Sequence, residues 1–118
     1  MSDHRKLQVW QRAHTLSVIV YRATESLGDN AGTHHYQSQL RRAAASVAAN
    51  IAEGRGQETA AQFGRYLSVA IGSANEALSH CAELQELSLI EERSAQHIHR
   101  ELEEIRAMLL GLRRKLRE

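Results

Sequence analysis

The stretch "QLRRAAASVAANIAEG", residues 39–54, decides the fold class of this 118-residue chain. Six of its residues are alanine and none is proline, a composition that strongly favours an α-helix. Four polar residues within it recur at spacings of four, four and three: Arg42, Ser46, Asn50 and Glu53. At about 100° per residue these side chains lie within about 80° of one another, so they form one polar column on an otherwise small, apolar helix.

The composition of the whole chain also favours helices. Hydrophobic residues make up 42% and charged residues 25%, which is ordinary for a globular protein, whereas aromatic residues make up only 4% and proline is absent. We therefore predict an all-α protein with a single domain, residues 1–118, and an aliphatic, alanine-rich core.

Hydrophobic periodicity predicts four amphipathic helices. Their expected ranges are about residues 5–27, 34–53, 60–87 and 94–117. Between them lie two glycine-containing breaks, "GDNAGT" at 28–33 and "GRGQET" at 54–59, and a weaker break, "SLIEERS", at 88–94. Four such helices joined by short loops are typical of an antiparallel up-and-down four-helix bundle, which is the architecture that we predict.

The expected core seams keep spacings of three and four residues. The first helix contributes Val9, Ala13, Leu16, Val20, Ala23 and Leu27. The second contributes Leu40, Val47 and Ile51. The third contributes Ala60, Phe63, Leu67, Ala70, Ala74, Ala77, Cys81 and Leu84. The fourth contributes Ala95, Ile98, Leu102, Ile105, Leu109, Leu112 and Leu116. We expect Thr33 and Thr59 to cap the second and third helices, and Gly54 to follow the end of the second.

The alanine-rich helix also indicates an oligomer. Its main apolar face lies about 120° from the polar column, and the remaining sector carries only alanines: Ala45, Ala48, Ala49 and Ala52. A helix that is small or apolar nearly all round is normally buried, whereas each helix of an isolated four-helix bundle keeps one side exposed. We therefore expect this helix to lie close to a subunit interface of a homo-oligomer.

The polar column allows two interpretations. As an enzyme site, Arg42 and Asn50 would hold an anionic substrate and Glu53 would act as a base. Against this, no nucleophile, no second carboxylate within a turn of Glu53 and no phosphate-binding glycine loop accompanies them. As a structural network that includes Ser46, Arg42 would pair with a carboxylate of the third helix, for which Glu76 is the best candidate. We favour the structural network and assign no catalytic residue.

Charge points to one end of the molecule. The chain has 15 basic and 14 acidic side chains, a net charge of +1, so it lacks the basic excess of a dedicated nucleic-acid binder. In an antiparallel bundle, however, both chain ends lie together and would collect six cations: Arg5, Lys6, Arg113, Arg114, Lys115 and Arg117. A ring of subunits would multiply this cluster into a basic face. The patch predicts binding of nucleic acid or an acidic partner, and the alternative is a solvated helix end whose cations complement the helix dipole.

The remaining reactive side chains favour no metal site or cofactor. The seven histidines include no pair at a spacing of four residues and no HExxH motif, which favours surface or interface histidines. The single cysteine, Cys81, falls in the third seam, where it is expected to be a core thiol. We expect no cofactor. We also expect no membrane span, because no apolar run approaches the necessary length, and therefore a cytoplasmic protein.

Three stretches resemble one known family: "LQVWQRAHTLSVIVYRAT" (7–24), "QLRRAAASVAANIAEGRG" (39–56) and "RYLSVAIGSANEAL" (65–78). The chain is similar to the four-helix-bundle proteins encoded in intervening sequences of bacterial 23S ribosomal RNA genes. The matching positions are Trp10, Ala13, Leu40, Arg41, Arg42, Ala43, Ser46, Asn50, Ile51, Glu53, Gly54, Leu67, Ala70, Gly72, Ser73 and Glu76. The resemblance implies a bundle that assembles into a ring, most often a pentamer, and it implies no established activity.

A more distant resemblance is to the accessory proteins of diversity-generating retroelements, which share the bundle and the ring and bind a reverse transcriptase and nucleic acid. The sequence therefore predicts a non-enzymatic homo-oligomeric scaffold or adaptor that binds RNA or an RNA-associated protein through its basic end. The first alternative is a purely structural protein-interaction module without nucleic-acid binding. The second is an enzyme that uses the column of Arg42, Asn50 and Glu53.

Overall fold

The computed structural model describes residues 3–25 and 31–117. Within them a short 3₁₀ turn precedes four α-helices, which confirms the all-α class and the four predicted helices. The elements are η1 (His4–Lys6), α1 (Gln8–Glu25), α2 (Ala31–Arg55), α3 (Ala60–Glu86) and α4 (Glu92–Arg117).

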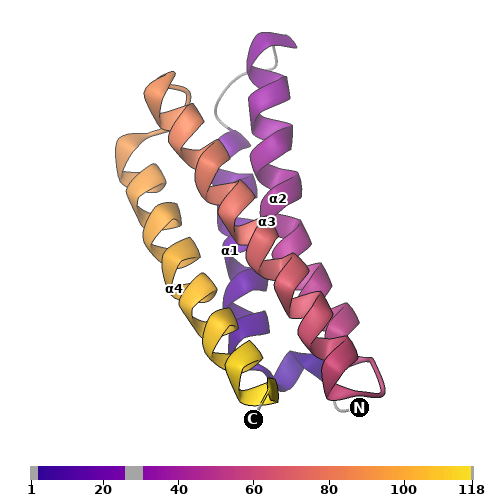
Figure 1. Cartoon of the computed structure of the whole chain (residues 1–118). Helices are drawn as coiled ribbons and strands as arrows, with labels where there is room; N and C mark the ends of the chain where they lie inside the picture. The colour runs from indigo at the N-terminus through magenta and orange to yellow at the C-terminus, as the bar shows by residue number, and fades with distance from the viewer. Residues whose placement is uncertain (1–2, 26–30, 118) are drawn as a thin grey trace.

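The helices pack as an elongated bundle of 45 × 20 × 19 Å. Each helix packs against two others: α2 and α3 have the most extensive contact, α3 packs on α4, and α1 closes the bundle against α2 and α4. η1, the turn between α2 and α3, and the last turn of α4 lie together at the lower end of the molecule in Figure 1. The bundle therefore gathers segments from the start, middle and end of the chain.

The core is aliphatic and alanine-rich, as the composition predicts. Two seams are confirmed almost in full: α3 buries every predicted position from Phe63 to Leu84, and α4 buries those from Ala95 to Leu109. The exceptions lie at helix ends, where the bundle opens to solvent. Ala60 is exposed, and Leu112 and Leu116 are half-buried.

The first seam departs from prediction near its end, because a polar residue replaces an apolar one. Ala23 is half-buried, while its neighbour Thr24 is fully buried. The Thr24 hydroxyl donates to the carbonyl of Val20 at 2.8 Å and accepts from Arg41 Nε at 2.7 Å, so burial leaves it hydrogen-bonded. The predicted seam position Leu27 lies outside the described residues.

The predicted start of α2 is wrong. α2 begins at Ala31, so Thr33 lies inside the helix and is not its N-cap. Residues 28–30 of the predicted break lie outside the described residues, whereas residues 31–33 are helical. The Thr59 cap is confirmed: its hydroxyl accepts from Gln62 N at 3.1 Å and the Gln62 side chain accepts from Thr59 N at 3.2 Å, a reciprocal capping box.

Gly54 has a different role from the predicted one. α2 continues to Arg55, so Gly54 is a helical residue and does not follow the helix end. A Cβ atom there would lie 2.6 Å from Tyr66 Cβ and 2.9 Å from Phe63 Cδ1 of α3. Glycine is therefore required because the backbone of α2 approaches α3 too closely for any side chain.

Candidate nucleic-acid interface

Half of the predicted polar column lies between α2 and α3. Ser46 Oγ is 2.8 Å from Ser73 Oγ of α3. Asn50 Nδ2 donates to the Ser46 carbonyl at 2.8 Å and to Ser46 Oγ at 3.0 Å. All three side chains are half-buried. The network joins the two helices at one level and opposes sliding of one past the other.

The other half of the column faces solvent, and the predicted pair of Arg42 with Glu76 is not formed among the described residues of the single chain. Arg42 Nη2 donates to Gln39 of its own helix at 2.9 Å. Glu76 lies 3.7 Å from His80 on α3. The helical angle explains the division: Arg42 and Glu53 lie within about 20° of each other, whereas Ser46 and Asn50 lie about 40° and 80° from Arg42. The described contact with α3 covers only that second side, so Arg42 and Glu53 stay exposed.

Five of the six predicted basic residues bring charge to one end of the bundle. Lys6 lies in η1, and α4 ends with Arg113, Arg114, Lys115 and Arg117. Both segments lie at the lower end of Figure 1. None of these five residues forms an ion pair with a carboxylate in the described part of the chain. We call this region, together with the start of α3, the basic end.

The sixth residue, Arg5, contributes little free charge. Its Nε and Nη2 atoms donate to both carboxylate oxygens of Asp3, at 2.8 to 3.1 Å. Hydrogen bonds from the Arg5 side chain and backbone lower the pKa of Asp3 to about 2, so the carboxylate stays ionised at physiological pH. Arg5 is therefore locally neutralised, although it lies at the predicted end.

Two residues of the basic end were missed by the sequence analysis: Arg65 and Ser68 of α3. Arg65 is exposed and forms no ion pair among the described residues. Ser68 Oγ accepts from Arg113 Nη1 at 3.1 Å and donates to the Gly64 carbonyl at 3.1 Å. The bundle brings them there because the start of α3 lies beside the end of α4 (Figure 1). Placing the predicted start of the third helix beside the predicted end of the fourth would have identified both residues from the sequence.

Basic side chains elsewhere can be paired. Arg12 of α1 donates to Glu101 at 2.7 Å and also to Glu104, both on α4. These bonds raise the pKa of Arg12 and hold the pKa of Glu104 below its usual value. The contrast with the basic end lies within one helix: α4 mixes Glu and Arg between Glu92 and Arg106, whereas every charged residue from Arg113 to Arg117 is a cation.

The cysteine is buried in the core, and two of the histidines lie near carboxylates of their own helices. Cys81 is fully buried, its sulfur lies 3.6 Å from the Ala95 carbonyl, and burial raises its pKa to about 11. His80 lies near Glu76 and Glu83, and His99 near Glu103, all within single helices. Among the described residues no three His, Cys, Asp or Glu side chains are grouped as a metal site would require. No helix in that part of the chain has the length and apolar character needed to cross a membrane.

Comparison with models of known protein families shows to which family the chain belongs. The model of the 23S rRNA-intervening sequence protein family matches residues 5–111, which include all four helices except the last six residues of α4. The chain belongs to this family. The matched region contains the polar column and the start of α3, whereas all four cations at the end of α4, Arg113, Arg114, Lys115 and Arg117, lie beyond it.

A solved structure supports the same fold for this member of the 23S rRNA-intervening sequence protein family. The chain is similar to a protein of unknown function from the S23 ribosomal protein family of Bacteroides thetaiotaomicron, with a TM-score of 0.77 and 21% sequence identity. The alignment covers 87% of this chain and 95% of the other. At that identity the likeness shows the fold alone. None of the curated proteins compared with the chain matches it.

Proposed function

We propose that this chain is a non-enzymatic, homo-oligomeric scaffold or adaptor that binds RNA or an RNA-associated protein through its basic end. In this proposal the four helices form an antiparallel up-and-down bundle, and several bundles join into a ring, which the family resemblance suggests to be a pentamer. The family, which consists of proteins of 23S rRNA intervening sequences, favours RNA as the nucleic acid.

One observation carries the proposal: charge is segregated although net charge is only +1. Lys6, Arg65 and the four cations at the end of α4 gather at one end, and none of them forms an ion pair in the described part of the chain. Nucleic-acid affinity comes largely from neutralising phosphates, which requires a local cluster of free cations more than a high net charge. A ring would repeat the cluster once per subunit.

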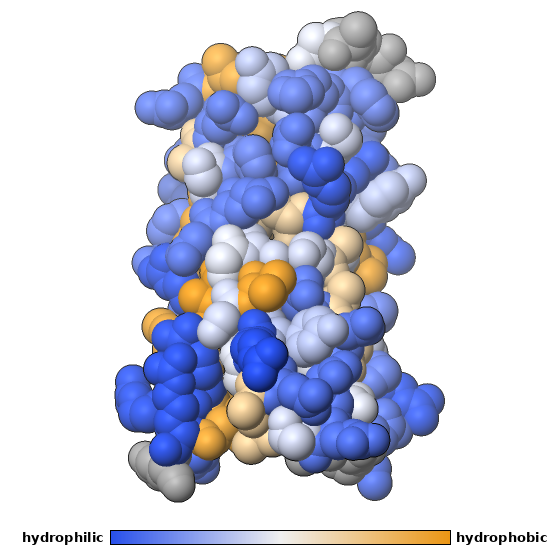
Figure 2. All heavy atoms as spheres, turned by 45° about the vertical axis from the view of Figure 1, so that its right-hand side comes forward, coloured by the Kyte–Doolittle hydropathy of each residue, from blue (hydrophilic) through white to orange (hydrophobic). Residues whose placement is uncertain are grey.

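An exposed stripe of α2 supports the oligomer. The stripe consists of Arg42, Ala45, Ala49 and Glu53, all exposed. The two alanines in the middle of the stripe offer no polar side chain to water. The two charged residues, Arg42 and Glu53, lie at its opposite ends. On the neighbouring helix α3, Val69 is 52% exposed. Figure 2 shows a pale to orange patch across the middle of the face that carries α2 and α3. A second copy of the chain would cover this patch and give Arg42 and Glu53 partners.

The function is tested with a gel shift of an RNA hairpin over a range of salt concentrations. We expect wild-type protein to bind and to lose affinity steeply between about 50 and 200 mM salt. Reversing Arg114, Lys115 and Arg117 to glutamate together should abolish the shift. The matched control reverses Arg22, Arg93 and Arg100, which are exposed on other parts of α1 and α4 and change the net charge equally.

The two triple variants separate the alternatives. Equal loss in both would mean that net charge alone drives binding, and the basic end would not be the interface. No shift with wild-type protein at low salt would favour the purely structural interaction module. An enzyme at Arg42, Asn50 and Glu53 is the least supported alternative, because the column is divided between an exposed side and an interhelical side.

A further inference from the structure

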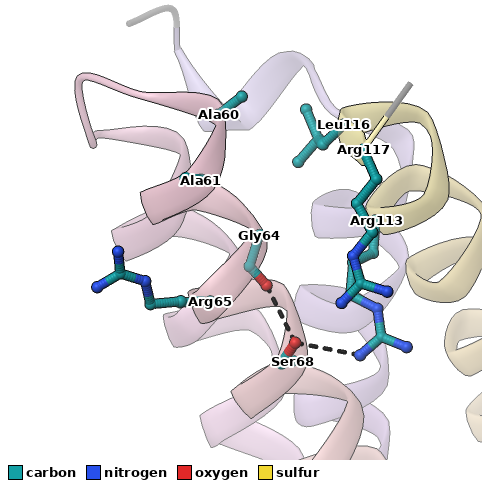
Figure 3. A pocket seen from close by; sticks show the side chains of 8 residues that line it. All are labelled: Ala60, Ala61, Gly64, Arg65, Ser68, Arg113, Leu116 and Arg117. Atoms are coloured by element: carbon teal, nitrogen blue, oxygen red, sulfur yellow. Dashed lines mark hydrogen bonds between the residues drawn. The ribbon is translucent and has the colours of Figure 1, made fainter.

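A hollow opens at the basic end between α3 and α4. It has a volume of about 420 Å³ and is lined by Ala60, Ala61, Gly64, Arg65, Ser68, Arg113, Leu116 and Arg117. Figure 3 shows small residues along the α3 wall and the side chains of Arg113 and Arg117 side by side along the α4 wall. Arg65 extends from α3 away from α4. We call this hollow the α3/α4 groove.

Two guanidinium groups point into the same space, and no carboxylate among residues 3–25 and 31–117 lines it with them. Within the part of the chain that the structure describes, Arg113 has one polar partner, Ser68, and Arg117 forms no ion pair. Like charges placed side by side repel, and an anion between them removes the repulsion. The Ser68 hydroxyl donates its hydrogen to the Gly64 carbonyl. The lone pairs of the Ser68 oxygen are then free to accept from Arg113, and this hydrogen bond holds the Arg113 guanidinium in the groove. The arrangement is preorganised for an anion.

The α3 wall is kept open at a cost to the helix. A Cβ atom on Gly64 would meet nothing within 4 Å, so packing does not require glycine there. Glycine in a helix interior is less favourable than alanine by about 1 kcal/mol. The first turn of α3 also contains no acidic residue, although a helix N-terminus favours one. Space is therefore retained on the α3 wall where a ligand would enter.

We propose that the α3/α4 groove seats one phosphodiester group of an RNA backbone, held by Arg113 and Arg117. Arginine forks match the geometry of phosphate oxygens, and two of them can contact one group from the same wall. A volume of about 420 Å³ admits the phosphate with its sugar. Arg65 borders the groove on α3, but its side chain extends away from α4, so it is not part of the seat. This inference rests on the proposed function and names the contact that carries it.

The experiment fills the groove without changing its charge. Gly64→Leu should occlude the space, while Gly64→Ala gains the same helix preference and leaves most of the space free. We expect Gly64→Leu to weaken binding of the RNA hairpin by about tenfold, as loss of a charged hydrogen-bonding contact does. The slope of log affinity against log salt should fall by about one. Gly64→Ala should bind as wild type does, and both variants should keep the wild-type melting temperature or exceed it and elute at the wild-type volume.

A second variant tests the same contact from α4, so that the result does not depend on a substitution in α3. Arg117→Gln should reproduce the loss caused by Gly64→Leu, and the two together should cost little more than either alone because they remove the same contact. If Gly64→Leu and Arg117→Gln both bind with wild-type affinity and slope, the phosphate seat is wrong while the proposed function stands.

Failure of the proposed function gives a different result. If wild-type protein does not bind the hairpin, inorganic phosphate is titrated while the side-chain NMR signal of Arg113 is followed. A shift in wild type that is absent in Gly64→Leu would mean that the groove takes free phosphate, and RNA as its source would be overturned. No shift in wild type would overturn the groove as an anion site altogether.

Discussion

Ser88 has the least favourable backbone conformation among the described residues. Its φ is 56°, and no other non-glycine residue there has a positive φ. It occupies the position after the C-cap of α3, where Ser88 N donates to Gln85 O at 3.1 Å and Leu89 N donates to Leu84 O at 2.8 Å. This is a Schellman motif, which usually has glycine at that position. The weak sequence break at 88–94 is thus a defined turn formed without glycine.

Replacing Ser88 by glycine should stabilise the protein. Left-handed backbone costs a non-glycine residue about 1–2 kcal/mol, part of which is offset by the greater freedom of glycine in the unfolded chain. We expect Ser88→Gly to raise the free energy of unfolding by about 0.5–1 kcal/mol in urea titrations. Ser79→Gly, the same change within the exposed helical surface of α3, should lower it. A loss of stability in Ser88→Gly would refute the account of the turn.

Cys81 should react slowly in the folded protein. Its thiol is fully buried and its pKa of about 11 keeps it protonated at pH 8. The thiolate is the reacting species, so both access and ionisation are unfavourable. Labelling with a thiol-specific disulfide reagent should be slow in buffer and complete within the mixing time in denaturant. Rapid stoichiometric labelling of the folded protein would contradict the placement of Cys81 in the core.

Among the elements, α2 and α3 have the most extensive contact, and Gly54 lies where α2 approaches α3 closely. Gly54→Ala places a Cβ atom 2.6 Å from Tyr66 Cβ, so the helices must separate. We expect the free energy of unfolding to fall by about 1–3 kcal/mol, a typical cost of overpacking. The control is Gly111→Ala in α4, where a Cβ meets nothing within 4 Å and stability should rise. Chemical denaturation monitored by circular dichroism measures both.

The contact between α1 and α4 should depend on pH through Glu104. The Arg12 hydrogen bond holds the pKa of Glu104 below its ordinary value of 4.5. A carboxyl whose pKa is lowered by folding adds stability that is present above its unfolded pKa and is lost as pH falls through the folded one. Arg12→Met should therefore be less stable than wild type at pH 7, and the difference should shrink below about pH 4.5.

Arg93→Met is the control for this pH dependence, because Arg93 is exposed and forms no ion pair in the described residues. Its difference from wild type should be small at every pH. Thermal unfolding of the three proteins across the acidic range measures the effect. A difference between Arg12→Met and wild type that is constant with pH would show that the interaction with Glu104 does not contribute to stability.

For the whole molecule, the proposed assembly depends on the exposed stripe of α2. Ala49 is exposed in the single chain, so Ala49→Glu should leave the bundle folded but place a charge in the proposed subunit interface. In light scattering coupled to size exclusion, wild type should have a mass that is a multiple of 13.2 kDa. Ala49→Glu should move toward 13.2 kDa with unchanged helical circular dichroism. Ala107→Glu, at a site on α4 that is also exposed, should assemble normally.

The same measurement tests the charged ends of the stripe. Arg42→Met removes the cation that would pair with Glu53 or another carboxylate of a neighbouring copy, and it should weaken assembly without unfolding the chain. An unchanged mass for both Ala49→Glu and Arg42→Met would place the interface elsewhere on the bundle. The RNA-binding proposal would then depend only on the measurements at the basic end.

The sequence by itself determined the four helices, their core residues and the Thr59 cap. These features follow from the helix and capping preferences of single residues and from hydrophobic spacings of three and four residues. Both depend only on residues that are close in the sequence. It also determined which end would be basic, because the order of the helices brings the chain ends together. Positions such as Thr24 were missed because burial of a hydroxyl depends on a distant partner, in this case Arg41.

The tertiary structure alone decided which polar residues meet. It divided the column into Ser46 and Asn50 against α3 and Arg42 and Glu53 in solvent, because a few tens of degrees of helix rotation separate a contact from an exposed surface. It neutralised Arg5 with Asp3 and brought Arg65 and Ser68 of α3 to the end of α4. Sequence spacing fixes angles around one helix, whereas partners across helices depend on the axial register and separation of two helices, which only packing sets.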